Sequence, residues 1–254
     1  MAACPIVNTL RPLITVCIAT YNGARYLRQQ LDSILHQLPT DSEIIISDDG
    51  STDGTLELLL QIQATTAVPI SVLTNPGPEH GSTANFEHAL RHAQGDFIFV
   101  ADQDDVWMDH KVEIMMQHLT QPGYSMVVSN ARIVDADLHV ICDDYYAARG
   151  VYRGLIGNFV KFGYLGCCMA LSRHALQCAL PFPRRRDYCN HDNWLYLCAS
   201  VTGRVEVLSE SLLLYRRHED NLSPGALNAH KSFGFRLRYR LYLAWHLLRH
   251  WLQA

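Results

Sequence analysis

The chain has 254 residues, of which 48% are hydrophobic and 18% are charged, so its composition excludes a disordered tail and predicts a buried core. The length fits one large domain with a short appendage. The 21 Lys and Arg residues stand against 25 Asp and Glu residues, which gives a net charge of −4. Because nucleic-acid binders usually carry a basic excess, we do not expect a nucleic-acid partner.

The cysteines and the N-terminal residues bear on the cell compartment. None of the eight cysteines forms a Cys-x-x-Cys pair, and a chain of this length needs no disulfide staples, so we expect reduced thiols. Residues 1–12 lack the basic start and the apolar core of a signal peptide. No apolar run reaches the roughly 18 residues that a membrane-spanning helix needs. These features favour a cytoplasmic protein.

In its first half the chain alternates between apolar runs typical of strands and helical spacings of apolar residues. The predicted strands cover residues 13–19, 43–47, 70–74 and 96–101, and the predicted helices cover 26–38, 55–67 and 83–93. Such alternation predicts an α/β fold with a mostly parallel central sheet and helices on both faces. Ligands bind at the carboxyl ends of parallel strands, and three of the predicted strands end in loops that carry Asp or Asn.

The second half of the chain is less regular. Further strands are predicted over residues 126–134, 139–142, 204–208 and 212–215, and further helices over 172–180 and 192–201. The glycine-rich residues 150–166 are expected to form a loop over the site.

The last segment, residues 224–254, is predicted to form a basic amphipathic helix. No Asp or Glu follows Asp220, and large apolar residues recur at helical spacing. These residues are Leu237, Leu241, Trp245, Leu248 and Leu252. A basic amphipathic helix that carries Trp suits a membrane surface with anionic lipids, and residues 231–254 are the candidate segment. The alternative is a helix docked on the core or in a dimer contact.

Three carboxylates crowd the end of the fourth predicted strand, in the stretch Asp102-Gln103-Asp104-Asp105. Because like charges repel, such a cluster costs stability unless a cation lies among them. Mg²⁺ and Mn²⁺ prefer carboxylate oxygens and often share a site with substrate phosphates. Side chains alternate along a strand, so Asp102 and Asp104 are expected to point to the same side. The alternative is a solvated acidic loop or a capped helix start.

A second acidic stretch, residues 47–53, follows the second predicted strand. A carboxylate at a strand end accepts hydrogen bonds from a nucleotide base or a ribose hydroxyl, and Asp49 is the candidate. Asp53 is interpreted as a turn or helix-cap residue. The chain has neither a Walker-type phosphate loop nor a G-x-G-x-x-G motif, so a nucleotide would be held without a glycine cradle. A metal on Asp102 and Asp104 would then have to neutralise its phosphates.

These motifs resemble those of the family-2 glycosyltransferases, which have a GT-A fold. The match rests on Ile18-Ala19-Thr20-Tyr21-Asn22-Gly23, Ser47-Asp48-Asp49-Gly50-Ser51-Thr52-Asp53 and Asp102-Gln103-Asp104-Asp105-Val106-Trp107, in this order. It continues through residues 163–173, 191–194 and 215–223. Bacterial rhamnosyltransferases of surface polysaccharide synthesis are the closest look-alikes. The resemblance implies a domain of residues 1–223, with a nucleotide-sugar half (about 13–110) and an acceptor half (about 111–223).

For the donor, the resemblance implies that Asp49 holds the nucleotide base. Tyr21 and the backbone of Ala19 and Thr20 would line the same pocket. Asp102 is assigned to the nucleotide site, where it would support a metal directly or through water.

For the chemistry, the resemblance implies that Asp104 ligates a divalent cation, Mn²⁺ or Mg²⁺, and that His218 lies near the metal or the diphosphate. Asp192 aligns with the general base of the family. The family often has Glu or Gln before this base, whereas this chain has His191, whose role stays open.

The residues and the resemblance together predict an inverting, metal-dependent glycosyltransferase. It would move a sugar from a nucleotide-diphosphate donor to a hydroxyl of a glycan acceptor on a lipid carrier, at the inner face of the cell membrane. One alternative is a nucleotidyltransferase, which also pairs an α/β sheet with acidic metal ligands but releases pyrophosphate. The other is a non-catalytic subunit that binds sugar nucleotides or glycans, against which Asp104 and Asp192 argue.

Overall fold

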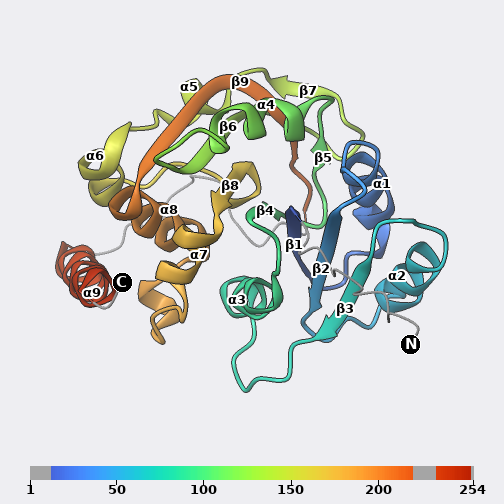
Figure 1. The fold of residues 1–254 in the computed structure, drawn as a ribbon, viewed down its shortest axis with the longest axis horizontal. Coiled ribbons are helices and arrows are strands. Elements are labelled where there is room, and N and C mark those ends of the chain that lie inside the picture. The colour runs from blue at the N-terminus through green and yellow to red at the C-terminus, as the bar shows by residue number, and fades with distance from the viewer. Residues whose placement is uncertain (1–12, 220–232, 253–254) are drawn as a thin grey trace, which may run out of the picture.

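The computed structural model describes residues 13–219 and 233–252, whose strands form one curved sheet in the order β3-β2-β1-β4-β8-β6-β9-β5, with β7 on β6 (Figure 1). The strands are β1 (Ile14–Thr20), β2 (Ser42–Asp48), β3 (Ile70–Thr74), β4 (Phe97–Ala101), β5 (Val106–Trp107), β6 (Tyr124–Val134), β7 (Val140–Cys142), β8 (Met169–Ser172) and β9 (Arg204–Arg216). The helices are α1 (Ala24–Leu35), α2 (Thr55–Gln63), α3 (Ser82–His92), α4 (Lys111–Leu119), α5 (Tyr145–Arg149), α6 (Gly154–Val160), α7 (Arg173–Ala179), α8 (His191–Thr202) and α9 (Phe233–Trp251), with short 3₁₀ helices η1 (Gly166–Cys168) and η2 (Arg186–Tyr188).

The parallel strands β1 to β4 form the first half of the sheet, as the sequence predicts. Their residues are mostly apolar because α3 covers one face of these strands, while α1 and α2 cover the other (Figure 1). The register pairs Thr20 with Asp48 and Ile18 with Ala101. The carboxyl ends of β1, β2 and β4 therefore lie at one edge, and the loops that follow them meet there.

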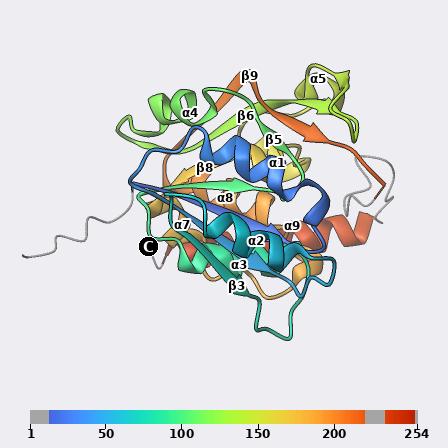
Figure 2. The same cartoon turned by 90° about the vertical axis from the view of Figure 1, so that its right-hand side faces the viewer.

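Over the whole sheet most paired residues are in parallel pairings, but beyond β4 the sheet is mixed. Strand β8 runs antiparallel between β4 and β6, and β6 pairs in parallel with β9. The long strands β6 and β9 lie side by side along one end of the molecule (Figures 1 and 2). The sequence did not predict β8 or α4. Strand β8 is too short for a periodic pattern to show.

Residues 204–208 and 212–215 form one strand, β9, and not the two strands expected. The polar residues between the two apolar runs suggested a turn. They lie instead in a bulge, where residues 208–210 face a single residue of β6 and the register shifts. The far part of β9 pairs with β5, and this continuous strand carries Arg216 to the edge where the loops meet.

The glycine-rich residues 150–166 contain helix α6 and do not form the expected loop. Helix α6 lies against α8 and exposes Leu155, Ile156 and Val160. The end of this segment, at Gly166, reaches the first turn of α8. The segment is therefore a small helical layer that ends at the site.

Helix α9 confirms the predicted C-terminal helix and lies against α7 and α8 at the outside of the molecule (Figure 1). Leu243 is 1% exposed and faces the core, whereas Leu241 (62% exposed) and Trp245 (65% exposed) face outward. The apolar stripe predicted from the sequence is thus the open face of the helix, and a different face docks on the core.

Two predicted features fall partly beyond the described residues. Residues 220–223 of the family resemblance and Lys231 of the basic segment lie outside them. Within 13–219 and 233–252, no helix is both long and apolar enough to cross a bilayer.

Candidate active site

The loops that follow β1 and β4 are tied together by one glutamine. The backbone N–H of Tyr21 donates to Gln103 Oε1 at 2.9 Å, and Gln103 Nε2 donates to the carbonyl oxygen of Tyr21 at 3.0 Å. A Cβ at Gly23 would lie 2.3 Å from Gln103 Oε1, so only glycine leaves room for this contact. Tyr21, which is exposed, and Ala19, which is half-buried, are thereby held beside the acidic loop.

The carboxylate of Asp49, the predicted base-binding residue, holds the loop between β3 and α3. Its Oδ1 accepts a hydrogen bond from Asn75 Nδ2 at 2.8 Å and lies 2.9 Å from His80 Nδ1, and its Oδ2 accepts one from the N–H of Gly81 at 2.7 Å. The N–H of Asp49 donates to the carbonyl oxygen of Thr20 at 2.9 Å. Sequence reasoning missed these partners because they lie 26 or more positions along the chain.

Asp48, which the sequence reasoning passed over, is fully buried and shapes the turn after β2. Its Oδ2 accepts hydrogen bonds from Thr20 Oγ1 at 3.0 Å and Ser51 Oγ at 2.5 Å, and its Oδ1 accepts one from the N–H of Gly50 at 3.0 Å. The carbonyl oxygen of Thr20 also accepts a hydrogen bond from Asn85 Nδ2 at 3.0 Å. Thr20 is predicted to line the nucleotide pocket, but its hydroxyl and its backbone carbonyl both make hydrogen bonds within the protein.

The acidic loop after β4 gathers two of its carboxylates with a thiol. Ligand atoms of Asp102, Asp105 and Cys167 lie within 4.8 Å of one another. Asp105 belongs to the sequence motif but was not among the predicted site residues. Because β4 ends at Ala101, the alternation that was expected to pair Asp102 with Asp104 does not extend into this loop.

The electrostatics of this cluster favour a cation. Burial first, and then the charges of Asp104 and Asp192, raise the pKa of Asp102 to about 7. Burial and the same Asp104, together with Asp102, raise the pKa of Asp105 well above its ordinary value. Asp105 Oδ2 is buried and has no hydrogen-bond partner within the described part of the chain. A divalent cation would relieve both the repulsion and the unsatisfied oxygen, so these residues fit a metal.

Asp104 and His218, the predicted metal ligands, lie side by side although 114 positions separate them. His218 Nε2 is 2.9 Å from Asp104 Oδ2, and both side chains are largely buried. The His218 ring centroid lies 4.7 Å from that of Tyr26 in α1. Since the charge of Asp104 acts on Asp102, this pair borders the cluster of Asp102, Asp105 and Cys167.

Two buried polar side chains position the acidic loop. Arg216, at the end of β9, donates from Nε to the carbonyl oxygen of Asp104 at 2.7 Å, and its backbone N–H donates to Asp105 Oδ1 at 3.0 Å. Gln30 of α1 donates from Nε2 to the carbonyl oxygen of Asp102 at 2.9 Å. These contacts join residues 111, 112 and 72 positions apart, so no local sequence signal reveals them.

Asp192, the predicted general base, lies in the first turn of α8. Its Oδ1 accepts a hydrogen bond from the N–H of Asn193 at 2.7 Å, and burial raises its pKa. Because its charge contributes to the raised pKa of Asp102, it lies within electrostatic reach of the acidic loop. A Cβ at Gly166 would lie 2.7 Å from His191 Nε2 and 3.3 Å from Asp192 Cβ, so this glycine lets η1 press against the start of α8.

His191, which precedes the predicted general base Asp192, packs against α3. Its ring centroid lies 4.2 Å from that of Phe86, and its backbone N–H donates to Thr83 Oγ1 at 3.3 Å. Burial lowers the pKa of His191, so the ring is neutral at pH 7. Its Nδ1 is buried, with no hydrogen-bond partner among the residues described. The uncharged ring therefore packs beside Asp192.

Comparisons with known proteins agree with this fold. The dTDP-rhamnosyl transferase RfbG of Shigella flexneri is 27% identical over 222 residues, which cover 80% of this chain and 72% of that protein. The mannosyltransferase PcManGT of Pyrobaculum calidifontis, solved with GDP-Man and Mn²⁺, matches with a TM-score of 0.62 and 21% identity. That match covers 95% of this chain, which spans 64% of the solved chain. S. aureus TarS 1-349 with UDP-GlcNAc matches with a TM-score of 0.63 and 18% identity, over 93% of this chain and 72% of its own. The fold shared with these two structures is the GT-A fold.

The family comparison covers most of the site. The model of glycosyl transferase family 2 matches residues 15–180, which include the ends of β1, β2 and β4, the acidic loop and Gly166. This match confirms the resemblance inferred from the three sequence motifs. The chain belongs to glycosyl transferase family 2, and its donor is a nucleotide sugar.

Proposed function

We propose that this glycosyltransferase moves its sugar to a hydroxyl of a glycan acceptor in polysaccharide biosynthesis, with a divalent cation and with inversion of the anomeric centre. The observation that carries the proposal is the pair of the half-buried Asp102 and the buried Asp105, whose raised pKa values and unsatisfied oxygen fit such a cation. The similar mannosyltransferase solved with GDP-Man and Mn²⁺ supports it. A bound Mn²⁺ or Mg²⁺ would offset the charge that grows on the diphosphate as the glycosidic bond breaks.

In this proposal the donor half of the domain, about residues 13–110, holds the nucleotide at the ends of β1 and β2. Asp49 would accept a hydrogen bond from the base, in place of or beside its present partners. The exposed Tyr21 side chain and the backbone of Ala19 and Thr20 would line the same pocket. Nothing in this arrangement needs a glycine-rich phosphate loop.

The cation is proposed to lie at the acidic loop. Asp102 and Asp105 offer carboxylate oxygens within 4.8 Å of one another, which suits one ion. Asp104 and His218 are also proposed as ligands, because they border this cluster. Their side chains lie side by side, with His218 Nε2 at 2.9 Å from Asp104 Oδ2. The four side chains would hold the metal and, through it, the diphosphate.

Asp192 is proposed as the general base, in the acceptor half of about residues 111–223. Burial raises the pKa of its carboxyl, and a carboxylate of raised pKa is a stronger base than an exposed aspartate. It would take the proton of the acceptor hydroxyl as that oxygen attacks the anomeric carbon. Attack from the face opposite the departing diphosphate inverts the configuration in a single displacement.

The test uses the full chain and a panel of nucleotide sugars, with dTDP-rhamnose first because of the 27% identity to a dTDP-rhamnosyl transferase. We expect nucleoside diphosphate to be released with Mn²⁺, to stop with EDTA and to resume when Mn²⁺ is restored. Asp192→Asn is expected to bind the donor but to lose about 10²–10⁴-fold in turnover. The matched control is Asp109→Asn, an exposed aspartate near the acidic loop.

Each contrary outcome points to a different reading. Release of pyrophosphate would indicate a nucleotidyltransferase. Donor binding without release from any sugar nucleotide would indicate a non-catalytic subunit. Wild-type turnover in Asp192→Asn would remove this residue as the base, and EDTA-insensitive turnover would remove the metal.

We also propose that the protein attaches to the anionic inner surface of the cell membrane, where it would meet a lipid-linked glycan acceptor. Exposed apolar side chains of α9 continue onto α6, and an apolar hollow lies between these helices. We call this surface the α6–α9 face. It comprises Ile156, Val160, Leu241, Trp245 and Leu248, and Ile156 is 82% exposed.

The charges around the α6–α9 face support the same partner. Neither helix contains Asp or Glu, whereas α9 carries several arginines and α6 lies between Arg153 and Lys161. Arg240 of α9 donates to the carbonyl oxygen of Val160 at 2.6 Å, which links the two helices. An apolar surface with a basic surround is typical of helices that lie in the interface of anionic membranes.

A further inference from the structure

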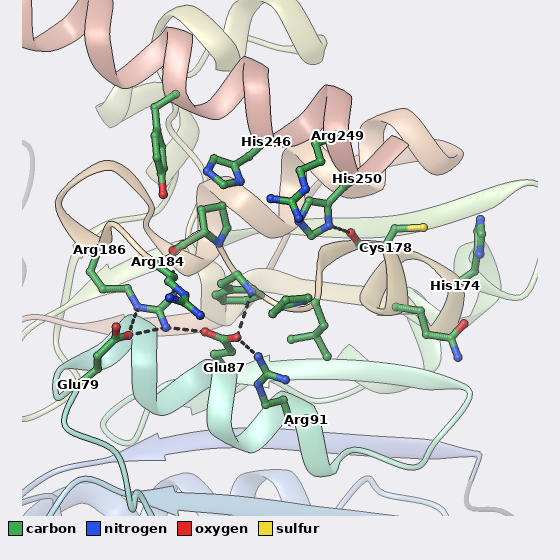
Figure 3. A pocket seen from close by; sticks show the side chains of 16 residues that line it. Glu79, Glu87, Arg91, His174, Cys178, Arg184, Arg186, His246, Arg249 and His250 are labelled. Atoms are coloured by element: carbon green, nitrogen blue, oxygen red, sulfur yellow. Dashed lines mark hydrogen bonds and ion pairs between the residues drawn. The ribbon is translucent and has the colours of Figure 1, made fainter. Parts of the chain in front are cut away.

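A large cavity lies on the inner side of α9, away from the acidic loop. Its volume is about 1150 Å³, and its walls come from α3, α7, α9 and residues 180–186 (Figure 3). That volume is large enough for a small-molecule ligand. The lining includes the basic side chains Arg91, Arg184, Arg186, His246, Arg249 and His250.

The carboxylates that line this cavity are Glu79 and Glu87, and both are already engaged by arginines of the wall. Glu87, which is buried, accepts from Arg91 at 2.5 Å and from Arg186 at 2.6 Å, and its Oε1 also accepts from the N–H of Phe182 at 3.0 Å. Glu79 lies 2.8 Å from the same Arg186 guanidinium. These contacts fix one wall of the cavity and pair both of its carboxylates with arginines.

The remaining cations of the cavity have no such compensation. Neither Arg184 nor Arg249 has an ion-pair partner within residues 13–219 and 233–252. Burial first, and then the positive charges of His250 and Arg249, lower the pKa of His246. Figure 3 shows Arg184 reaching into the space below α9, while His246, Arg249 and His250 face it from the helix. The cavity thus holds two guanidinium groups, of Arg184 and Arg249, that no carboxylate of the described residues pairs with.

We propose that this cavity binds an anion that carries phosphate, held by the guanidinium groups of Arg184 and Arg249 with His246 beside them. Guanidinium groups suit phosphate because their N–H donors match its oxygens in pairs. The site differs from the donor site in its chemistry, since it offers cations and needs no metal, whereas the acidic loop repels an anion unless a metal is bound. The phosphate could belong to a soluble metabolite or to a lipid headgroup.

The first experiment titrates the full chain with inorganic pyrophosphate in a calorimeter, at physiological ionic strength and with EDTA, so that the acidic loop holds no metal. We expect saturable binding to one site. The double variant Arg184→Ala/Arg249→Ala is expected to raise the Kd by about tenfold or more. The control Arg28→Ala/Arg204→Ala removes two exposed arginines elsewhere and should keep the wild-type Kd. All four residues are exposed, so an unchanged thermal midpoint is expected and is checked for each variant.

A second experiment separates the two sources of phosphate. The protein is sedimented with zwitterionic vesicles that contain or lack phosphatidic acid, and pyrophosphate is added as competitor. If pyrophosphate weakens binding to phosphatidate vesicles, and the cavity double variant gains less from phosphatidate than the wild type does, the ligand is a lipid phosphate. If vesicle binding ignores pyrophosphate while calorimetry shows the site, the ligand is soluble. Absence of saturable pyrophosphate binding, or an equal Kd in the two double variants, would overturn the proposal.

Discussion

At the residue scale, burial separates the carboxylates of this chain into two kinds. Asp144 accepts hydrogen bonds from the side chain of Asn130 and the N–H of Ala147, and these bonds lower its pKa. Asp105, which is buried, and Asp102, which is half-buried, lie beside further carboxylates, and their pKa values are raised instead. The first kind stabilises a turn, whereas the second stores repulsion that a cation relieves.

Gly166 gives a prediction about Asp192, the proposed general base. A methyl group there would lie 2.7 Å from the His191 ring and 3.3 Å from Asp192 Cβ, so Gly166→Ala must displace the start of α8. We expect a loss of about 1–3 kcal/mol in the free energy of unfolding, and a fall in kcat larger than this loss explains. Urea unfolding and steady-state kinetics measure the two effects.

The matched control for this glycine is Gly234→Ala in α9, where a Cβ would meet open space. It is expected to leave kcat unchanged and to be neutral or to stabilise by up to about 1 kcal/mol. A wild-type kcat in Gly166→Ala would show that the first turn of α8 need not be held in its present place.

The sequence located the acidic loop but not the contacts that hold it. The acidic motif and its place after β4 follow from an apolar run that ends in Asp, and Asp104 does meet His218. The grouping of Asp102 with Asp105 did not follow, because strand periodicity fails in a loop. The supporting contacts of Arg216 and Gln30 cross most of the chain, and a single sequence carries no trace of them.

At the element scale, the helices and strands that are long and regular could be predicted, and the short or irregular ones could not. Strands β1, β2 and β4 are mostly buried apolar runs, β3 is a partly exposed edge strand, and all four alternate with periodic helices, so both their type and their order could be predicted. Strand β9 was split in two because its bulge places polar residues where a turn would. Helix α6 was taken for a loop because its glycines hid a short helix whose apolar residues are exposed.

Helix α1 supports the acidic loop as well as the core, and Gln30 tests this. Gln30→Met keeps the length of the buried side chain but removes its hydrogen bond to the carbonyl oxygen of Asp102. We expect a loss of about 0.5–1.5 kcal/mol in the free energy of unfolding and a higher Mn²⁺ concentration for half-maximal turnover. Arg28→Met, on the exposed face of the same helix, should change stability by less than about 0.5 kcal/mol and leave the Mn²⁺ dependence alone. Equal Mn²⁺ curves for both variants would refute the supporting role.

At the scale of the whole molecule, α9 uses its faces for different purposes. Its inner side bonds to the body: Tyr239 contacts Asn193, His250 Nδ1 lies 2.8 Å from the carbonyl oxygen of Cys178, and the hydroxyl of Tyr242 accepts from the N–H of Arg185 at 3.1 Å. Its outer side belongs to the α6–α9 face. The sequence predicted the amphipathic stripe but not which side of the helix would dock, because that depends on the surface it meets.

The α6–α9 face predicts membrane binding that point substitutions can remove without unfolding the protein. Leu241→Ser/Trp245→Ser should lower the partition onto anionic vesicles by about tenfold or more, since burying a large apolar side chain contributes about 1.5–3 kcal/mol when complete. Both side chains are exposed, so the thermal midpoint should not move. Added salt should weaken the wild-type interaction.

The control for this experiment is Leu60→Ser, an equally exposed leucine on α2. Equal partition of both variants would exclude the α6–α9 face as the membrane surface. If the double variant instead converts a dimer to a monomer in analytical ultracentrifugation, the face is a subunit contact.

The bond between Tyr239 and Asn193 has a consequence for regulation. The helix that would rest on lipid also braces the residue next to Asp192. If α9 binds a bilayer and Asp192 deprotonates the acceptor, as we propose, both events depend on the docking of this one helix, and a change that detaches α9 from the body would disturb both.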